Sequence, residues 1–184
     1  MYGMVNNALK DLIRSERGED GWDRVRAAAS VEDDSFFSTE PYPDDLTYRL
    51  LEAAAKELDI TPEEVQHRFG KWWVLKTGLD GYGHLMRGAG SNLREFLFNL
   101  PNFHTRVGLF FPALKPPEFE CTDVSSKGLR LHYRSTRAGL APFVVGLLAG
   151  LGEMFDTPVK VVHEQRAGDG ADHDVFHVEW GGVP

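Results

Sequence analysis

Hydrophobic residues in the first half of the chain recur at intervals of three and four, which is the period of an α-helix. The pattern opens with an apolar series made of Val5, Ala8, Leu9, Leu12 and Ile13. It returns from Leu46 to Leu58, directly after Asp44 and Asp45, whose carboxylates favour the first turn of a helix. Two helices are therefore predicted in this part of the chain.

Further helix signals follow toward the middle of the chain. The segment Thr61–Glu64 is a capping box with proline at the first helical position. It opens a helix that carries Trp73 and is expected to end at Gly78. Ser91 is expected to cap the next helix, and a helical segment resumes after Pro101. The first half is thus predicted to be helical.

The second half has the pattern of strands and tight turns. Phe119 to Val124 and Leu129 to Thr136 are short, partly alternating runs separated by a turn, which predicts a hairpin. Val159 to Gln165 and Val175 to Trp180 predict a second hairpin across a glycine-containing turn. The uncharged run from Ala138 to Gly152 lies between them and predicts a buried helix. Helices first and strands later indicate an α+β fold.

Composition and net charge indicate which kinds of binding partner are to be expected. The 184 residues suit one domain, and 42% hydrophobic content is enough for a sizeable core. With 20 basic and 28 acidic residues the net charge is −8 and no basic run is present, so nucleic acid and anionic membranes are not expected partners. We expect a cytoplasmic protein, because no signal or membrane-spanning segment is recognisable and Cys121 is the single cysteine.

Tyr133, Ser135 and Arg137 form the pattern with the most specific chemistry. On an extended segment alternate side chains share a face, so two hydroxyls and a guanidinium would meet the same ligand. The trio suits paired carboxylates such as haem propionates. His104, upstream among apolar residues, is then the candidate axial ligand of the iron. Without further support, the trio would be read as solvent-exposed polar residues of an edge strand. A lone histidine such as His104 would usually be a structural or surface residue.

His173 and His177 raise the question of a second metal site. Residues four apart on a strand share a face, so both imidazoles could meet one ion. Zinc sites need three or four protein ligands, and no third ligand is in view near this pair. The only metal ligand predicted from the sequence is therefore His104.

The order of these features along the chain resembles the haem-nitric oxide/oxygen binding (H-NOX) domains, relatives of the haem domain of soluble guanylate cyclase. The matching segments are Met1–Asn6, Asn102–Gly108, Pro116–Pro117, the Tyr-x-Ser-x-Arg trio and Gly139–Pro142. The resemblance implies a stand-alone bacterial member, one domain over residues 1–184, with haem b (iron protoporphyrin IX) between two lobes. A distal helical lobe is expected over about 1–60, and a haem-ligating lobe with an antiparallel sheet and helices over about 61–184.

The resemblance also implies roles for individual residues. It aligns His104 with the proximal ligand of the iron and the trio with the groups that hold the propionates. It aligns Pro117 with a proline that packs against the haem and holds the macrocycle out of plane. Asp44 aligns with a residue that can pair with Arg137 across the two lobes, and the alternative role for Asp44 is a helix N-cap.

The distal side implied by the resemblance is apolar. Oxygen-binding members place a tyrosine at the position of Pro142, so their hydrogen-bond donor to dioxygen is missing here. The expected distal lining consists of Met4, Val5, Trp73 and Phe143. These features predict a sensor of nitric oxide and carbon monoxide at ferrous haem, with poor or no dioxygen binding. The alternative is an oxygen-binding or redox haem protein, since the indole N–H of Trp73 is still a donor.

Signalling is expected without a catalytic step in this chain. Nitric oxide is expected to weaken the bond between iron and His104, after which the haem relaxes against Pro117 and the lobes shift. The resemblance suggests a histidine kinase or a cyclic-di-GMP enzyme as the partner in trans. A peroxidase-type haem enzyme is disfavoured because no distal acid–base residue is in view. A module for an organic ligand would not need His104 at all.

Overall fold

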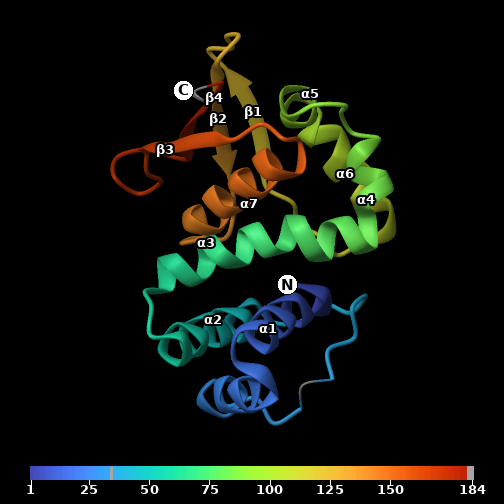
Figure 1. Ribbon diagram of the computed structural model, residues 1–184, viewed down its shortest axis with the longest axis vertical. Helices are drawn as coiled ribbons and strands as arrows, with labels where there is room; N and C mark the ends of the chain where they lie inside the picture. The colour runs from blue at the N-terminus through green and yellow to red at the C-terminus, as the bar shows by residue number, and fades with distance from the viewer. Residues whose placement is uncertain (34, 182–184) are drawn as a thin grey trace.

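Two helices that pack against each other form one end of the molecule. The computed structural model describes residues 1–33 and 35–181, and it begins with helices α1 (Gly3–Ala28) and α2 (Asp44–Leu58). Both lie on one side of a long helix that crosses the middle of the molecule (Figure 1). Their shared core contains Leu9, Ile13 and Leu50, each 0% exposed, so the apolar series read from the sequence is the buried face.

The long middle helix is continuous where the sequence predicted an end. It comprises α3 (Pro62–Trp72), the π-helical turn η1 (Trp73–Gly78) and α4 (Leu79–Arg87). The predicted stop at Gly78 is wrong, because its backbone stays helical at φ −67° and ψ −50°. A Cβ at this position would lie 2.9 Å from Met86 Sδ, so the glycine serves close packing and not a left-handed turn. The inserted π turn shifts the register of the residues that follow.

Two short helices lead to the candidate iron ligand. They are α5 (Leu93–Phe98) and α6 (Leu100–Phe110). The cap of α5 is Asn92, whose side-chain oxygen accepts a hydrogen bond from the Glu95 backbone N–H at 2.9 Å. Ser91, the predicted cap, instead donates its hydroxyl to the Glu95 carboxylate at 2.6 Å. The prediction missed by one residue because both side chains can cap and only the backbone angle decides between them.

The C-terminal part is an antiparallel sheet with a helix on one face, so the α+β prediction is confirmed. The strands are β1 (Glu118–Thr122), β2 (Gly128–Arg134), β3 (Val159–Gln165) and β4 (Asp174–Trp180), in the order β1-β2-β4-β3. Both predicted hairpins are present, and pairing of β2 with β4 joins them. Helix α7 (Ala141–Met154) is the predicted uncharged helix, and it packs against β3 and the long middle helix (Figure 1).

Glycines set how closely α3 and α7 approach each other. A Cβ at Gly146 of α7 would lie 2.0 Å from the carbonyl oxygen of His67, and a Cβ at Gly70 of α3 would lie 2.2 Å from that of Phe143. Both distances are far inside van der Waals contact, so only glycine allows this crossing. The crossing fixes the long middle helix against α7, which in turn packs on β3. Among the residues described, no helix combines the length and apolar character that a membrane crossing needs.

Candidate functional site

His104 lies on α6 and is packed between aromatic rings. Its imidazole stacks on Phe119 of β1, with ring centroids 5.6 Å apart and an interplanar angle of 17°. Phe119 in turn touches the ring of Tyr133 on β2 at 5.4 Å. The structure therefore connects the candidate iron ligand to the first member of the trio through one phenylalanine. Phe119 was not singled out from the sequence, because only the docking of α6 on β1 shows the contact.

Burial sets the protonation state of His104. It lowers the pKa of the imidazole from 6.5 to about 4, so the ring is neutral at physiological pH. Its Nδ1 is buried and has no hydrogen-bond partner among the described residues. A neutral imidazole carries its hydrogen on one ring nitrogen and a free lone pair on the other. A neutral, unpartnered imidazole nitrogen is what ligation of haem iron requires.

The trio does not share one strand. Tyr133 is in β2 and 5% exposed, but the strand ends at Arg134, so Ser135 and Arg137 lie in the bend that follows. The trio is therefore not carried by one strand, but its side chains stay together, because Ser135 hydrogen-bonds to the Tyr133 side chain and Arg137 lies near enough to influence the pKa of Tyr133. The bend is held by Ser135 Oγ, which accepts from the backbone N–H of Arg137 at 3.0 Å, and the Ser135 side chain also hydrogen-bonds to Tyr133.

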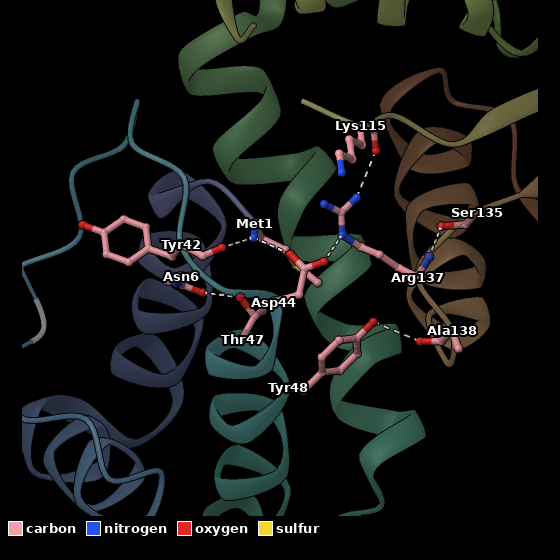
Figure 2. Close-up of polar contacts among 10 residues, drawn as sticks. All are labelled: Met1, Asn6, Tyr42, Asp44, Thr47, Tyr48, Lys115, Ser135, Arg137 and Ala138. Atoms are coloured by element: carbon pink, nitrogen blue, oxygen red, sulfur yellow. Dashed lines mark hydrogen bonds and ion pairs between the residues drawn. The ribbon is translucent and has the colours of Figure 1, made fainter. Parts of the chain in front are cut away.

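Arg137 connects the bend after β2 to two distant segments. Its Nε donates to Asp44 Oδ2 at 2.8 Å, and its Nη1 donates to the carbonyl oxygen of Lys115 at 2.9 Å (Figure 2). The remaining terminal nitrogen has no hydrogen-bond partner within the described residues. Arg137 is 20% exposed at the side chain, so this free edge of the guanidinium is partly shielded from water. The N–H groups of this edge can still donate hydrogen bonds to a carboxylate ligand.

Asp44 takes the pairing role and not the capping role. Helix α2 begins at Asp44 with Pro43 in the capping position. The Asp44 carboxylate accepts from Arg137 and, at 2.5 Å, from the backbone nitrogen of Met1 (Figure 2). Burial raises the pKa of Asp44, but the hydrogen bonds from Met1 and Arg137 outweigh it and hold the pKa below 3.8. The carboxylate is therefore charged at neutral pH, and the ion pair between the lobes is complete.

A second contact from α2 supports the same bend. Tyr48, one turn after Asp44, donates its hydroxyl to the carbonyl oxygen of Ala138 at 3.0 Å (Figure 2). The two side chains of α2 thus hold residues 137 and 138 together. Sequence reasoning missed Tyr48, although its spacing of one helical turn from Asp44 was the available signal.

Two of the four expected distal residues, Trp73 and Phe143, flank one ring. Val5, Trp73 and Phe143 all pack against the core of the helical lobe. Phe69 contacts the ring of Trp73 at 6.3 Å and that of Phe143 at 5.2 Å. Met4 makes a different contact, with its sulfur 3.9 Å from the hydroxyl of Tyr82. Val5, Trp73 and Phe143 belong to one hydrophobic cluster and Tyr133 to another.

The two candidate prolines stand at the starts of elements. Pro117 is partly buried and immediately precedes β1, between Lys115, which binds Arg137, and Phe119, which stacks on His104. Pro142 lies in the first turn of α7, where a missing N–H costs nothing. Pro117 therefore lies between a residue bound to Arg137 and a residue stacked on His104.

The histidine pair considered for zinc is not on one strand. His173 precedes β4, whereas His177 lies within it. His173 instead shares a hydrogen bond with His132 at 2.8 Å between ring nitrogens. No group of three or more potential metal ligands occurs in residues 1–33 and 35–181.

Comparison with known proteins decides the family. A family model described as haem-NO-binding matches residues 2–163, which is most of the chain. The chain belongs to the haem-NO-binding (H-NOX) family. Among curated proteins, soluble guanylate cyclase gcy-31 of Caenorhabditis elegans is 30% identical over 162 residues, which is 88% of this chain and 23% of that protein. Soluble guanylate cyclase 89Da of Drosophila melanogaster is 26% identical over 84% of this chain and 23% of its own length. The chain thus spans about a quarter of these relatives.

Solved H-NOX structures have the same fold. An H-NOX protein from S. oneidensis in the Fe(II)NO ligation state gives a TM-score of 0.88 at 20% identity, covering 98% of this chain and 99% of that chain. The Fe(II) unliganded H-NOX protein from K. algicida gives 0.86 at 19% identity, covering 100% of this chain and 98% of that chain. The mixed architecture, with a helical N-terminal part and a four-stranded antiparallel sheet, is therefore an H-NOX fold.

The haem that H-NOX domains bind fits the residues present. His104 offers a neutral nitrogen whose partner is missing, in a buried aromatic setting. Arg137 keeps a free edge of its guanidinium, which is suited to propionate carboxylates, and the side chains of Ser135 and Tyr133 are hydrogen-bonded to each other. Burial raises the pKa of Tyr133, so its phenol stays protonated and can donate as well. This donor set fits a haem better than a bare metal ion, for which no cluster of ligands is assembled.

Proposed function

We propose that this H-NOX chain is a haem b sensor of nitric oxide and carbon monoxide that binds dioxygen poorly or not at all. The observation that carries the proposal is His104, a partly buried neutral imidazole whose Nδ1 has no hydrogen-bond partner among the described residues, linked through Phe119 to the trio residue Tyr133. When bound, the haem would supply a ferrous iron that takes up either gas on the side away from the histidine. The residues of this chain hold and tune that group.

The proposed holding residues come from both lobes. His104 gives its free nitrogen to the iron, and Tyr133, Ser135 and Arg137 donate hydrogen bonds to the propionates. Arg137 is the strongest of these donors, because its charge and planar fork match a carboxylate. Pro117, whose ring fixes its backbone angle, would pack against the bound haem from the segment that leads to β1. Met4, Val5, Trp73 and Phe143 form the distal wall.

Selectivity in this proposal follows from what the distal wall lacks. Nitric oxide bonds strongly to ferrous haem without help, whereas dioxygen is stabilised by a hydrogen-bond donor. Position 142 is a proline in the first turn of α7 and offers neither a hydroxyl nor an N–H. Phe143, the next residue in the chain, and Val5 on α1 are apolar and offer no side-chain hydrogen-bond donor either. The wall is therefore expected to favour nitric oxide and carbon monoxide over dioxygen.

The proposed signal is a change in the tether of α6. If His104 held the haem iron and that hold weakened, α6 would lose its attachment to the site, while Arg137 would keep the bend after β2 attached to α2 through Asp44. The lobes can then adopt a second arrangement, which affects a partner only if the partner prefers one state. Leu109 and Phe110, 78% and 72% exposed at the end of α6, would move with it. A histidine kinase or a cyclic-di-GMP enzyme acting in trans is the expected partner.

No catalytic step is assigned to this chain itself. The matched region is 23% of the length of gcy-31 and of 89Da, so the cyclase activity named for those proteins is not carried over. A cytoplasmic location is part of the proposal, because a single cysteine suits a reducing compartment.

Absorption spectroscopy tests the proposal directly. The purified protein, supplied with haem, is reduced and then exposed separately to nitric oxide, carbon monoxide and air. We expect distinct spectral changes with the first two gases and no stable product with air. Failure of the protein to bind haem, or haem binding unaffected by the double change His104→Gly with Arg137→Ala, would contradict the proposed site. A stable dioxygen complex would contradict the selectivity.

A further inference from the structure

An open hollow of about 810 Å³ lies where α4 ends and α5 begins. Its lining includes the side chains of Arg87, Arg94 and Phe98. Phe98 is 46% exposed, so an apolar ring is open to solvent in the same hollow as two cationic groups. Arginine and aromatic side chains are the residues that protein contact surfaces favour. The hollow therefore has the composition of a surface that binds another protein.

Neither arginine is neutralised within the part of the chain that the structure describes. No carboxylate of residues 1–33 or 35–181 forms an ion pair with Arg87 or Arg94. Arg94 instead lies over the ring of Phe98, with 5.9 Å between Cζ and the ring centroid. Glu95, the acidic residue of the lining, accepts from the backbone N–H and the hydroxyl of Ser91 at 2.9 and 2.6 Å. Both guanidinium groups can therefore bind a carboxylate from outside the chain.

The segment around the hollow is basic, although the chain as a whole is acidic. Residues 81–117 include four Lys or Arg residues and one acidic residue, whereas the whole chain has 20 basic and 28 acidic residues. Arg87 and Arg94 are two of these four basic residues. A local excess of positive charge attracts an acidic partner and orients it during approach.

An acidic protein segment fits the hollow better than a phosphate-rich ligand does. The carboxylate of Glu95 lies in the same lining as the two arginines, so it would repel a concentrated anion such as a polyphosphate. Two arginines are also few for an anionic membrane, which basic clusters bind. A peptide can place separate carboxylates against Arg87 and Arg94 and an apolar side chain against Phe98.

The hollow is connected to the candidate iron ligand through α5 and α6. Asn99 donates from Nδ2 to the carbonyl oxygen of Ala89 at 2.8 Å, which ties the loop after α4 to the start of α6. On the buried side of α5, Phe96 contacts the ring of Phe103 at 5.5 Å, and Phe103 contacts the imidazole of His104 at 5.7 Å. Figure 1 shows α5 at the end of the molecule away from α1 and α2. A molecule bound in the hollow would therefore be sensitive to the position of α6.

We propose that the hollow lined by Arg87, Arg94 and Phe98 is the docking surface for an acidic segment of a partner protein. Carboxylates of that segment bind the two guanidinium groups, and an apolar side chain covers the ring of Phe98. The inference rests on the proposed function in one respect, because the segment belongs to the partner in trans that the proposed signal reaches. Movement of α6 then changes how well α5 presents the hollow to that partner.

Fluorescence anisotropy with two labelled synthetic peptides tests the docking surface. One peptide combines glutamate with leucine and phenylalanine, and the other has glutamine in place of every glutamate. We expect the purified protein to bind the acidic peptide, and the double variant Arg87→Gln with Arg94→Gln to bind it about tenfold more weakly or worse. Phe98→Ser should weaken binding by about threefold to tenfold.

The matched control is the double variant Lys127→Gln with Lys160→Gln. It removes the same amount of charge from two exposed lysines of the sheet region and should bind the acidic peptide as the parent protein does. No saturable binding of the acidic peptide up to about 1 mM, or equal weakening in the two double variants, would overturn the docking surface. Tighter binding of tripolyphosphate, or of vesicles containing phosphatidylserine, would assign the arginines to a phosphate ligand and overturn it as well.

A comparison of the ferrous protein with and without nitric oxide separates this inference from the proposed function. We expect the affinity for the acidic peptide to differ between the two samples. If binding depends on Arg87 and Arg94 but is the same in both samples, the docking surface stands and the proposed signal fails. If binding ignores the two arginines while the haem spectra respond to nitric oxide as expected, the docking surface fails and the proposed sensor stands.

Discussion

Arg137 and Asp44 form an ion pair between the two lobes, with 2.8 Å between Nε and Oδ2. The two side chains are 20% and 40% exposed, so water screens the pair only in part. The same arginine is the main proposed holder of the haem propionates. The link between the lobes and the proposed haem site therefore meet in one side chain.

Removing the carboxylate of this pair should weaken the junction of the lobes. Asp44→Asn is expected to lower the free energy of unfolding by about 1 kcal/mol, because the pair is partly exposed. Urea denaturation at pH 7 of the haem-free protein measures this. Asp45→Asn is the control, since its carboxylate is 70% exposed and lies 3.5 Å from Arg49 on the same helix. Equal losses in the two variants would contradict a special role for the Arg137 pair.

The Asp44 pair should also depend on pH in a defined direction. The pKa of Asp44 is lowered in the folded protein from 3.8, so folding favours the charged carboxylate. Its contribution is complete above pH 3.8 and is lost as the pH falls through the lower folded-state pKa. The difference in unfolding free energy between the parent protein and Asp44→Asn should therefore shrink in acid. A difference that is constant from pH 7 down to pH 3 would argue against the pair.

His104 should make the haem-free protein less stable as the pH falls from neutral. The folded imidazole stays neutral down to about pH 4, whereas the unfolded one takes up a proton near pH 6.5. The unfolded state binds more protons in this window, so stability decreases as the pH drops from 6.5 toward 4, by on the order of 2 kcal/mol. His104→Leu should remove this part of the slope in urea denaturation. An unchanged slope would mean that His104 is accessible to protons in the folded state.

Haem retention should rank the proposed propionate donors. Arg137→Ala is expected to weaken haem binding by about tenfold to a hundredfold, and Ser135→Ala by about threefold to tenfold, because a charged donor contributes more than a neutral hydroxyl. Transfer of haem to an excess of apomyoglobin measures both. Arg134→Ala serves as the control, since Arg134 pairs with Glu120 at 3.3 Å on the sheet. Retention by Arg137→Ala equal to that of the control would remove Arg137 from the site.

Adding even one methyl group at the crossing of α3 and α7 should destabilise the protein. Gly146→Ala would place a Cβ 2.0 Å from the His67 carbonyl and should cost about 1–3 kcal/mol of unfolding free energy through overpacking. Gly108→Ala is the matched control, because a Cβ on that helical residue would meet nothing within 4 Å. The control should keep or slightly increase stability through its better helix propensity. Thermal unfolding of both variants distinguishes them.

Local patterns predicted most of the elements correctly. The capping box at residues 61–64 does begin α3, with Thr61 accepting from the Glu64 N–H, and both hairpins form where turn residues separate two strand-like runs. These signals depend on a few neighbouring residues, so they can be recognised in the sequence alone. Gly78 shows the limit, because a glycine that ends a helix and one that permits a close contact look alike in sequence. The roles assigned to the trio and the distal wall stay predictions.

The sequence by itself determined the helix and strand periods, the α+β class and the kinds of side chain available for a haem. Only the tertiary structure decided which of them meet: Phe119 under His104, Asp44 against Arg137, and Tyr82 against Met4. It also placed Ser135 and Arg137 in a bend and not on a strand. The physical reason is that such contacts depend on strand register, helix crossing and the inserted π turn. These are set by packing over the whole chain and not by any local run of residues.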